Sequence, residues 1–538
     1  MTYAPFTRSG QIWALQYKFL LMLHLTNIDF CLFISTARVR QRLIDSIGSR
    51  KDRHGRVVCF IGFGKTLVIK KILIANRGEI AVRIVRACAE MGIRSVAIYS
   101  DADRHALHVK RADEAYSIGA EPLAGYLNPR KLVNLAVETG CDALHPGYGF
   151  LSENAELAEI CAERGVKFIG PAAEVIRRMG DKTEARRAMI QAGVPVTPGT
   201  EGNVADIQEA LAEGERIGYP VMLKATSGGG GRGIRRCNSR EELEQAFPRV
   251  ISEATKAFGS AEVFLEKCIV NPKHIEAQIL GDSQGNVVHL FERDCSIQRR
   301  NQKLIEIAPS PQLTPEQRAY IGDLAVRAAK AVNYENAGTV EFLLAEGEVY
   351  FMEMNTRVQV EHTITEEITG IDIVREQIRI ASGLPLSVKQ HDIQHRGYAL
   401  QFRINAEDPK NNFLPSFGKI TRYYAPGGPG VRTDTAIYTG YTIPPFYDSM
   451  CLKLVVWALT WEEAMDRGLR ALDDMRVQGV KTTAAYYQEI LRNPEFRSGE
   501  FNTSFVECHP ELTHYSTKRK PEELALAIAA AIAAHAGL

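Results

Sequence analysis

The stretch Thr339-Val-Glu-Phe-Leu-Leu-Ala-Glu-Gly-Glu-Val-Tyr-Phe-Met-Glu-Met-Asn355 contains two apolar-rich runs on either side of Ala345-Glu-Gly-Glu348. This pattern predicts a β-hairpin whose turn sets Glu341 roughly opposite Glu353, with Asn355 on the same face as Glu353. Directly opposed carboxylates destabilise a sheet. Two carboxylates and an amide oxygen are ligands that suit Mg²⁺ or Mn²⁺ bound together with phosphates. The hairpin therefore predicts a metal and phosphate site, the alternative being solvated charges on an exposed hairpin.

A glycine-rich loop forms a second candidate phosphate site, in Val221-Met-Leu-Lys224-Ala-Thr-Ser-Gly228-Gly-Gly-Gly231-Arg-Gly233. An apolar strand precedes Lys224, and five glycines then occupy six positions. Each glycine in a regular element costs about 0.5 to 1 kcal/mol, so close approach to a ligand or hinge motion is the expected reason. The loop lacks the Gly-Lys-Ser/Thr ending of a Walker A motif. We expect a mobile lid over phosphates within a small unit at about residues 200–270, with a plain flexible linker as the alternative.

The length and composition of the chain limit the classes of protein to which it can belong. The 538 residues are enough for roughly three or four domains. With 65 basic and 64 acidic residues the net charge is +1, so no overall field favours nucleic acid or an anionic membrane. The ten cysteines are scattered singly, without a CxxC pair, which is typical of reduced thiols in a cytoplasm. We expect a cytoplasmic protein with no nucleic-acid and no membrane partner.

Residues 1–67 differ from the rest of the chain. The apolar run Ile12–Ser35 is interrupted by Lys18 and Asp29, and a charge at mid-span costs about 2.5 to 3.5 kcal/mol on insertion scales, which disfavours a transmembrane helix. The string Cys59-Phe-Ile-Gly-Phe-Gly64-Lys-Thr66 is similar to the end of a P-loop but has Cys59 where glycine is required. We expect an extension of uncertain order or a mis-assigned translation start.

A nucleotide-style α/β pattern begins at Val68. Its first turn, Asn76-Arg-Gly78, lacks the G-x-G-x-x-G fingerprint, so the fold is Rossmann-like but NAD is not the expected ligand. Later segments favour an α+β lobe at residues 404–512 and a terminal helix that docks on a partner or caps the core. The expected elements are strands at Ile69–Ala75, Ser95–Ser100, Ala143–His145, Val166–Gly170 and Tyr398–Ala406, and helices at Glu79–Met91, Glu366–Gly383 and Pro521–His535.

The glycine lid, the lysines and the carboxylate pair together describe an ATP-grasp site, and at this point the chain resembles the biotin carboxylase family from about Val68 to about Cys508. Several specific strings in family order support this resemblance: Ile74-Ala-Asn-Arg-Gly-Glu79, His145-Pro-Gly-Tyr-Gly-Phe-Leu-Ser-Glu-Asn154, Met179-Gly-Asp-Lys182, Arg293-Asp-Cys-Ser-Ile-Gln-Arg-Arg-Asn-Gln-Lys303 and Glu353-Met-Asn-Thr-Arg-Val-Gln-Val-Glu-His362.

The resemblance implies an α/β and α+β multidomain protein with a Rossmann-like N-terminal domain, an ATP-grasp domain carrying the lid and a C-terminal α+β lobe. We place the boundaries at residues 1–67, 68–181, 182–395, 396–512 and 513–538.

The resemblance also implies a role for each matching residue. ATP would contact Lys182, Lys224, Gly230, Gly231, Glu266, Lys267, Ile269, His274, Gln298, Asn301 and Leu343, with Glu266, Lys267 and Ile269 at the adenine hinge. Two Mg²⁺ or Mn²⁺ ions would be held by Glu341, Glu353 and Asn355. Bicarbonate would lie among Lys303, Arg357, Gln359 and Val360, and biotin would meet Arg403 and Tyr148. The expected catalytic residues are Glu361, Arg357, Lys303 and Arg403.

The implied reaction is ATP-dependent carboxylation of biotin through carboxyphosphate. Glu361 would deprotonate bicarbonate for attack on the γ-phosphate, and Arg403 would stabilise the oxyanion that develops on the biotin ureido group. One departure is Asn301, which stands where the well-known bacterial acetyl-CoA carboxylase component has histidine. Asn can donate and accept hydrogen bonds but carries no charge, so altered ATP affinity is expected there rather than lost chemistry.

No biotin-attachment motif is present, because the nearest string, Glu463-Ala-Met-Asp466, has Asp where lysine is needed. Biotin must then come from a carrier protein or a biotin-carrying subunit that works with a carboxyltransferase subunit, and the family implies a homodimer of this chain. The length and the tail are most similar to the A subunit of a two-subunit pyruvate carboxylase, with acetyl-CoA carboxylase as the alternative. A different ATP-grasp ligase, such as a carbamoyl-phosphate-forming enzyme, and a non-catalytic nucleotide-binding regulator are the competing classes.

Overall fold

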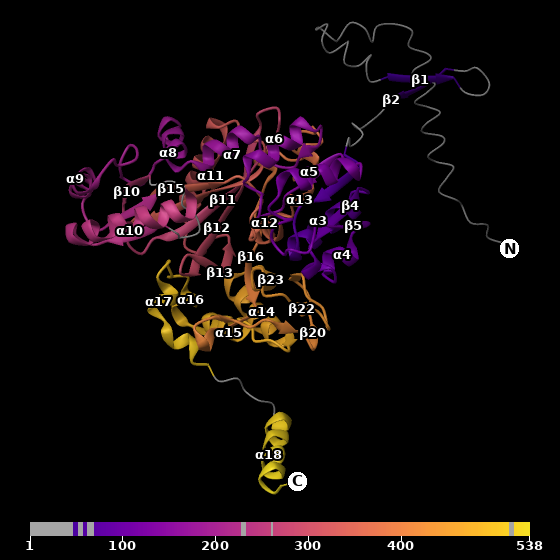
Figure 1. The fold of residues 1–538 in the computed structure, drawn as a ribbon, viewed down its shortest axis with the longest axis vertical. Helices are drawn as coiled ribbons and strands as arrows, with labels where there is room; N and C mark the ends of the chain where they lie inside the picture. Colours follow the sequence, from indigo (N-terminus) through magenta and orange to yellow (C-terminus); the bar gives the residue numbers. More distant parts are fainter. Residues whose placement is uncertain are drawn as a thin grey trace, which may run out of the picture. The chain divides into compact units, whose positions relative to one another are not determined.

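The computed structural model describes residues 47–51, 57–61, 69–226, 233–259, 262–515 and 521–537 (Figure 1). The chain divides into two compact units, Met1–Thr66 and Leu67–Leu538. In the first unit, β1 (Ile47–Lys51) and β2 (Val57–Ile61) form an antiparallel pair. The apolar run at residues 12–35 and residues 62–66 of the P-loop-like string lie outside the described residues. None of the helices in the described ranges is both long and apolar enough to cross a bilayer.

The second unit begins with a five-stranded parallel sheet in the order β5-β4-β3-β6-β7. Alternate residues of β3 face opposite layers: Ile72 and Ile74 pack with α3, and Leu73 packs with α5 and α6. Helices on both faces explain why Ile72, Leu73 and Ile74 of β3 are all apolar, and they confirm the Rossmann-like prediction. The elements are β3 (Lys71–Ile74), β4 (Arg94–Tyr99), β5 (Glu114–Ser117), β6 (Ala143–His145), β7 (Lys167–Phe168), α3 (Gly78–Glu90), η1 (Asp101–Asp103), α4 (Leu107–Arg111), α5 (Pro129–Glu138) and α6 (Ala155–Glu163).

A small antiparallel sheet in the order β10-β8-β9 corresponds to the predicted lid unit. Its core is formed by Leu223 of β8 with Leu211 and Phe247 from the two helices that cover the sheet. Residues 227–232, which include Gly230 and Gly231, lie outside the described residues. The elements here and just before the unit are α7 (Ala173–Gly180), α8 (Lys182–Gln191), α9 (Ile207–Ile217), β8 (Val221–Ala225), β9 (Ile234–Cys237), α10 (Arg240–Phe258) and β10 (Val263–Lys267).

An eight-stranded antiparallel sheet in the order β15-β14-β11-β12-β13-β16-β23-β21 forms the centre of the second unit. On β11, Ile275, Ala277 and Ile279 pack with α11 in one apolar layer, while the alternating His274, Glu276 and Gln278 are buried on the opposite face. That opposite face is polar, and it carries the candidate site. The strands and the covering helix are β11 (Lys273–Gly281), β12 (Val287–Arg299), β13 (Gln302–Ala308), β14 (Asn336–Ala345), β15 (Glu348–Asn355), β16 (Tyr398–Asn405), β21 (Val431–Thr435), β23 (Met450–Ala458) and α11 (Pro315–Ala331).

The prediction of one helix from Glu366 to Gly383 is wrong, because the chain forms α12 (His362–Thr369) and α13 (Ile373–Ala381). Gly370 ends α12 with a left-handed φ of 71°, and the Asp372 side chain then accepts a hydrogen bond from the Arg375 N–H to begin α13.

The C-terminal lobe is mixed α+β, as predicted, and it shares the central sheet, since β16 pairs with β13. Phe402, Leu452, Trp461 and Tyr487 belong to its core. The further elements are η2 (Gln390–Asp392), β17 (Glu407–Asp408), η3 (Pro409–Asn411), β18 (Leu414–Pro415), β19 (Gly418–Lys419), β20 (Arg422–Tyr424), β22 (Thr442–Ile443), α14 (Trp461–Asp474), β24 (Arg476–Gln478), α15 (Ala484–Arg492), α16 (Pro494–Ser498), α17 (Phe505–Cys508) and η4 (Pro510–Thr513).

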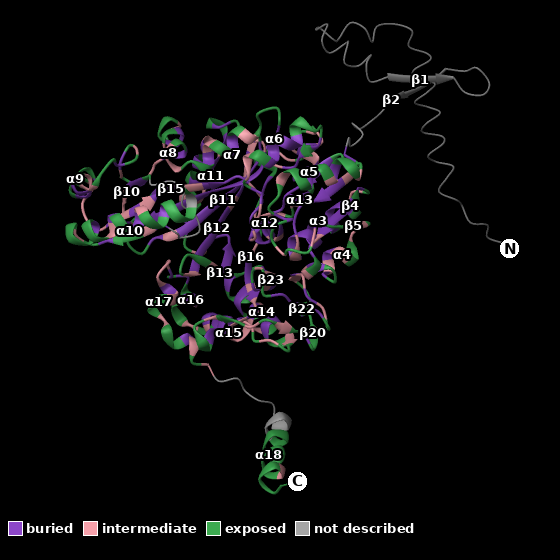
Figure 2. Cartoon of the chain, viewed as in Figure 1, coloured by how far each residue is buried: buried purple, intermediate pink, exposed green. Residues whose placement is uncertain are grey.

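The predicted terminal helix is present as α18 (Pro521–His535). Three of its large apolar side chains are exposed, with relative exposures of 75% for Leu526, 52% for Ile528 and 63% for Ile532 (Figure 2). An apolar helix with exposed leucine and isoleucine side chains is typical of a segment that is covered by another protein surface.

Candidate active site

The β14–β15 hairpin has the predicted register. Glu341 lies directly opposite Glu353, and Thr339 lies opposite Asn355. Glu341 is buried; it accepts a hydrogen bond from Asn355 Nδ2 at 2.9 Å and pairs with His274 Nε2 at 2.7 Å. The turn and the period-two alternation thus bring two predicted metal ligands into contact and place the third across the strand pair.

The two opposed carboxylates have pKa values that shift in opposite directions. Burial and the negative charge of Glu341 raise the pKa of Glu353. For Glu341 burial acts in the same direction, but the charges of Lys303 and His274 outweigh it and hold the pKa well below its usual value. A divalent cation between the two strands would favour the ionised form of both groups. The donor set of two carboxylates and one amide oxygen therefore fits Mg²⁺ or Mn²⁺.

His274 and Glu276 form another cluster of donor atoms with Glu341, all within 4.8 Å of one another. Both come from β11, which pairs with β14 so that Glu276 lies directly opposite Glu341. His274 is one of the predicted ATP contacts, whereas sequence reasoning gave Glu276 no role.

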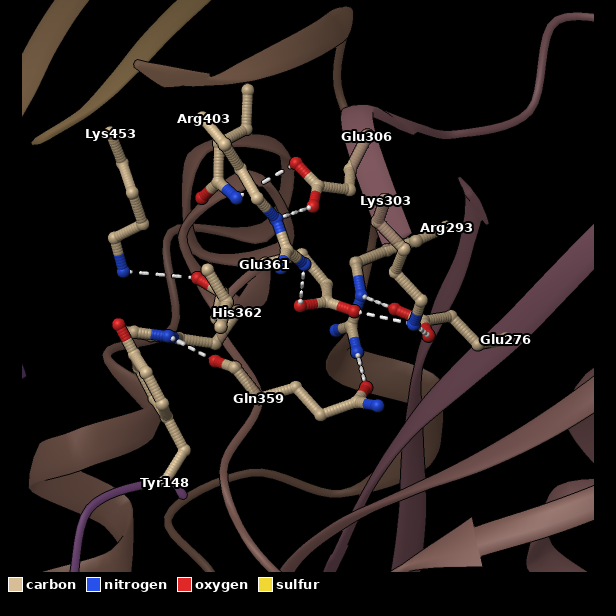
Figure 3. Close-up of polar contacts among 12 residues, drawn as sticks. Tyr148, Glu276, Arg293, Lys303, Glu306, Gln359, Glu361, His362, Arg403 and Lys453 are labelled. Atoms are coloured by element: carbon tan, nitrogen blue, oxygen red, sulfur yellow. Dashed lines mark hydrogen bonds and ion pairs between the residues drawn. The ribbon is translucent and has the colours of Figure 1, made fainter. Parts of the chain in front are cut away.

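Lys303 is the centre of a buried ionic network (Figure 3). Its Nζ lies 2.5 Å from Glu276, 3.0 Å from Glu341 and 2.6 Å from Glu361. Burial alone lowers the pKa of Lys303, but the surrounding Cys295 and carboxylates raise it well above its usual value. Lys303 is therefore a fixed positive charge between the β14–β15 hairpin and Glu361.

Glu361 lies between two cations, and Figure 3 shows it beside Lys303 and Arg403. Its Oε1 pairs with Lys303 at 2.6 Å and its Oε2 accepts from Arg403 Nη2 at 3.1 Å. Burial raises its pKa, yet the charges of Lys303, Arg403 and Arg293 hold the pKa below its usual value. Glu361 is therefore ionised, as a proton acceptor must be.

The segment between β15 and α12 supplies the other predicted bicarbonate contacts. Arg357 donates to Glu153 at 2.9 Å and to Asn355 Oδ1 at 2.8 Å. Gln359 donates to Glu341 at 2.6 Å, and the Val360 carbonyl accepts from Lys453 at 3.0 Å. These contacts link Arg357 and Gln359 to the metal-ligand side of the site.

The remaining predicted ATP contacts lie on the lid unit, at the start of α8, on β12 and β14, and in two connecting segments. Lys224 on β8 forms a short hydrogen bond with Glu266 on β10, while Lys267 donates to the backbone carbonyls of Gly218 and Tyr219 at 2.8 and 3.1 Å. Burial lowers the pKa of Lys182, which begins α8. Asn301 is exposed in the turn between β12 and β13, with a left-handed φ of 62°. Gln298, Ile269 and Leu343 are partly exposed.

The predicted biotin contacts are held by carboxylates. Arg403 donates to Glu306 at 2.5 Å as well as to Glu361. The Tyr148 hydroxyl forms a short hydrogen bond with Glu79 on α3.

Arg293 belongs to one of the family strings but was given no role by sequence reasoning. It is fully buried, and it donates to Glu276, to Gln278 at 2.7 Å and to Gln359 at 2.8 Å. It thereby fixes one carboxylate of the Lys303 network and the predicted bicarbonate contact Gln359. The alternation of His274, Glu276 and Gln278 between apolar residues on β11 is the signal that could have revealed this polar face.

Comparisons with known proteins identify the family. Residues 68–176 match the biotin carboxylase N-terminal domain, and residues 401–508 match the biotin carboxylase C-terminal domain. Between them, residues 181–389 match the ATP-binding domain of the carbamoyl-phosphate synthase L chain. The chain belongs to the biotin carboxylase family. The two flanking matches exclude the carbamoyl-phosphate-forming alternative, and the chain is an ATP-dependent biotin carboxylase.

Individual relatives agree with this assignment. The chain is 54% identical over 472 residues to the 2-oxoglutarate carboxylase small subunit of Hydrogenobacter thermophilus, covering 88% of this chain and 100% of that protein. It is 53% identical over 441 residues to the A subunit of the pyruvate carboxylase of Methanothermobacter thermautotrophicus, covering 82% of this chain and 90% of that protein.

A solved structure confirms the predicted fold of this biotin carboxylase. The biotin carboxylase domain dimer of Hydrogenobacter thermophilus 2-oxoglutarate carboxylase, in complex with MgADP, ADP and bicarbonate, is 55% identical, with a TM-score of 0.82 over 84% of this chain and 99% of that chain.

Proposed function

We propose that the chain is the biotin carboxylase subunit of a two-subunit carboxylase, and that it uses ATP and bicarbonate to carboxylate biotin carried by a separate subunit. The observation that carries this proposal is the position of the Glu361 carboxylate, between Lys303 at 2.6 Å and Arg403 at 3.1 Å. The Glu361 carboxylate thus lies between Lys303, which is next to the proposed metal site, and Arg403, which is assigned to biotin.

In the proposed mechanism, Glu361 removes the proton from bicarbonate while Lys303, Arg357, Gln359 and Val360 orient it toward the γ-phosphate. Attack on the γ-phosphate displaces ADP, and the resulting carboxyphosphate breaks down to CO₂ and phosphate. The phosphate takes the N1′ proton of biotin, and N1′ then adds to CO₂ to form carboxybiotin. Arg403 stabilises the negative charge that develops on the ureido oxygen, and Tyr148 lines the same pocket. Arginine suits that role because it stays protonated and offers several donors.

ATP and two divalent cations complete the proposed site. Glu341, Glu353 and Asn355 would hold Mg²⁺ or Mn²⁺, which would neutralise phosphate charge. Lys182, Lys224, His274 and the lid glycines are assigned to the phosphates and ribose, and Glu266, Lys267 and Ile269 to the adenine hinge. We also propose domain boundaries at residues 1–67, 68–181, 182–395, 396–512 and 513–538.

Relative lengths favour an assembly of two kinds of subunit. The matched family domains extend from residue 68 to residue 508, a span of 441 residues. The match to the Hydrogenobacter thermophilus small subunit covers 472 residues, which is 31 more than this span. The Bacillus subtilis relative named biotin carboxylase 1 matches 445 residues at 99% of its own length. We therefore assign α18 to contact with the biotin-carrying and carboxyltransferase partner, and we infer a homodimer of this chain in the cytoplasm.

The proposed acceptor is pyruvate, and 2-oxoglutarate is a second candidate because the small subunit of a 2-oxoglutarate carboxylase matches over its full length. The test is to reconstitute the chain with its biotinylated partner, and then to measure carboxylation of pyruvate, 2-oxoglutarate and acetyl-CoA separately. Carboxylation of acetyl-CoA alone would contradict the assignment to a 2-oxo acid carboxylase.

A further inference from the structure

A buried lysine, Lys453, lies beside the proposed biotin site without a role in the mechanism above. It is on β23, directly opposite Arg403 on β16 and Asp434 on β21, and its exposure is 0%. Directly opposed residues in a sheet project from the same face, so Lys453 and Arg403 share the face that carries the site. Lysine is almost never fully buried unless it is paired.

The partners of Lys453 come from distant parts of the chain. Its Nζ donates to the Val360 carbonyl at 3.0 Å and forms an ion pair with Glu79 Oε2 at 3.1 Å. The other oxygen of Glu79 accepts the hydroxyl hydrogen bond of Tyr148. Lys453 Nζ also lies 5.8 Å from the centre of the Tyr148 ring, and Figure 3 shows both side chains on the same side of Glu361.

The neighbouring Asp434 does not account for the burial of Lys453. Arg432 donates to both Asp434 oxygens, at 3.2 and 2.9 Å. Burial raises the pKa of Glu79, and the charge of Lys453 is the largest effect that opposes this rise. Glu79 is thus the carboxylate that depends on Lys453 for charge compensation.

Stability alone is a poor reason for such a pair. The desolvation of two buried charges offsets most of their attraction, and apolar replacement of both partners is often neutral or stabilising. The location of the contacts supplies a better reason, because Val360 immediately precedes Glu361 and Tyr148 lines the proposed biotin pocket. The Lys453 ammonium group therefore contacts the backbone next to the proposed base, Glu361. Through Glu79 it is also connected to Tyr148, which is assigned to biotin.

We propose that Lys453 is a positioning residue which, together with Glu79, fixes the Val360 carbonyl and the Tyr148 ring around the biotin and bicarbonate sites. The inference rests on the proposed function, which assigns Arg403 and Tyr148 to biotin and Glu361 to the base. Lys453 itself has no contact with a reacting atom in this mechanism. It acts by holding the Val360 carbonyl and the Tyr148 ring, which line the proposed bicarbonate and biotin sites. A displacement of about 1 Å at a reacting centre can reduce turnover by about 10²-fold.

The test uses three variants of the full chain. Lys453→Met removes the charge and leaves Glu79 uncompensated. The double variant Lys453→Met with Glu79→Gln removes both charges while the introduced amide oxygen can still accept from Tyr148, so it keeps the test informative if the single variant is unstable. Lys71→Met is the matched control, because Lys71 Nζ also binds a carboxylate, Glu114, at 2.8 Å and a backbone carbonyl, that of Thr139, at 2.7 Å, and it belongs to no proposed site.

The readout is the set of KM values for free biotin, bicarbonate and ATP, with kcat, in proteins shown to be folded by thermal unfolding. We expect both Lys453 variants to raise the KM for biotin and bicarbonate about tenfold and to lower kcat by a further tenfold or more, with the KM for ATP changed less than about twofold. The Lys71 control should match wild type.

Three results would overturn the role: wild-type biotin and bicarbonate kinetics in the folded double variant, an equal rise in all three KM values, or loss of folding in both variants. The first would show that the pair is dispensable, and the other two would assign it to general structure. Failure of the proposed function is distinct, because the wild-type chain would then show no biotin-stimulated phosphate release.

Discussion

Replacement of Glu361 by Gln is the sharpest perturbation of the proposed mechanism, since it keeps the shape of the side chain and removes its charge and basicity. Lys303 retains Glu276 and Glu341, and Arg403 retains Glu306, so neither cation is left without a carboxylate. The cost in folding free energy should therefore be below the 3 to 5 kcal/mol that is roughly typical of a broken buried ion pair.

The cost in catalysis should be large. A positioned general base contributes about 10² to 10⁴ in rate, so turnover should fall by at least about 10²-fold, which corresponds to about 2.7 kcal/mol in activation free energy. The amide introduced by Glu361→Gln would also present N–H donors toward Lys303 or Arg403, both of which are donors. ATP affinity should be nearly unchanged, because the proposed ATP contacts do not include Glu361.

The assay is steady-state phosphate release as a function of bicarbonate, with ATP binding measured by calorimetry. Glu292→Gln is the matched control, because Glu292 is a buried carboxylate that accepts from Arg318 at 2.8 Å outside the proposed site. Wild-type bicarbonate-dependent turnover in Glu361→Gln would refute the assignment of the base. A loss of turnover in the control equal to that in Glu361→Gln would show that the effect is not specific to the site.

Three further outcomes are expected. Glu353→Gln should raise the Mg²⁺ concentration for half-maximal activity at least about tenfold, because the hairpin loses one anionic ligand, and an unchanged Mg²⁺ titration would contradict the assigned metal site. Burial lowers the pKa of His108 to about 4 and of His145 to about 3. As the pH falls below about 6.5, the ordinary pKa of histidine, the unfolded chain takes up a proton at each position before the folded chain does. The free energy of unfolding should therefore fall by about 2 kcal/mol for each histidine by about pH 5. Urea unfolding at about pH 7.5 and about pH 5 measures this loss of stability, and the loss should be smaller in His108→Gln. An equal loss in the variant would contradict a contribution from buried His108. Deletion of residues 516–538 should leave carboxylation of free biotin within about twofold of wild type and abolish copurification with the coexpressed biotin-carrying subunit; retained copurification would show that α18 is not the docking element.

The hairpin site was predictable from sequence because its geometry is local. A short turn and the period-two alternation fix which residues face each other, and the structure pairs Glu341 with Glu353 accordingly. The Gly370 and Asp372 signals that separate α12 from α13 are also present in the sequence, but the apolar periodicity on both sides of them favours a single helix.

The buried ionic network was not predictable in the same way, because it joins residues that are distant in sequence. Arg293 meets Gln359 across 66 positions, and Arg403 meets Glu306 across 97. No local rule sets these pairs, which depend on the strand order of the central sheet. For the network on β11, the alternation of His274, Glu276 and Gln278 with apolar residues is the sequence signal that could have revealed the polar face.

The most direct test of the central claim is ATP hydrolysis by the purified chain with Mg²⁺ and bicarbonate, with and without free biotin. The account predicts phosphate release that requires bicarbonate and rises with biotin, together with carboxybiotin as a product. Protein that binds ATP but releases phosphate independently of biotin, and forms no carboxybiotin with either free biotin or a biotinylated carrier domain, would contradict it.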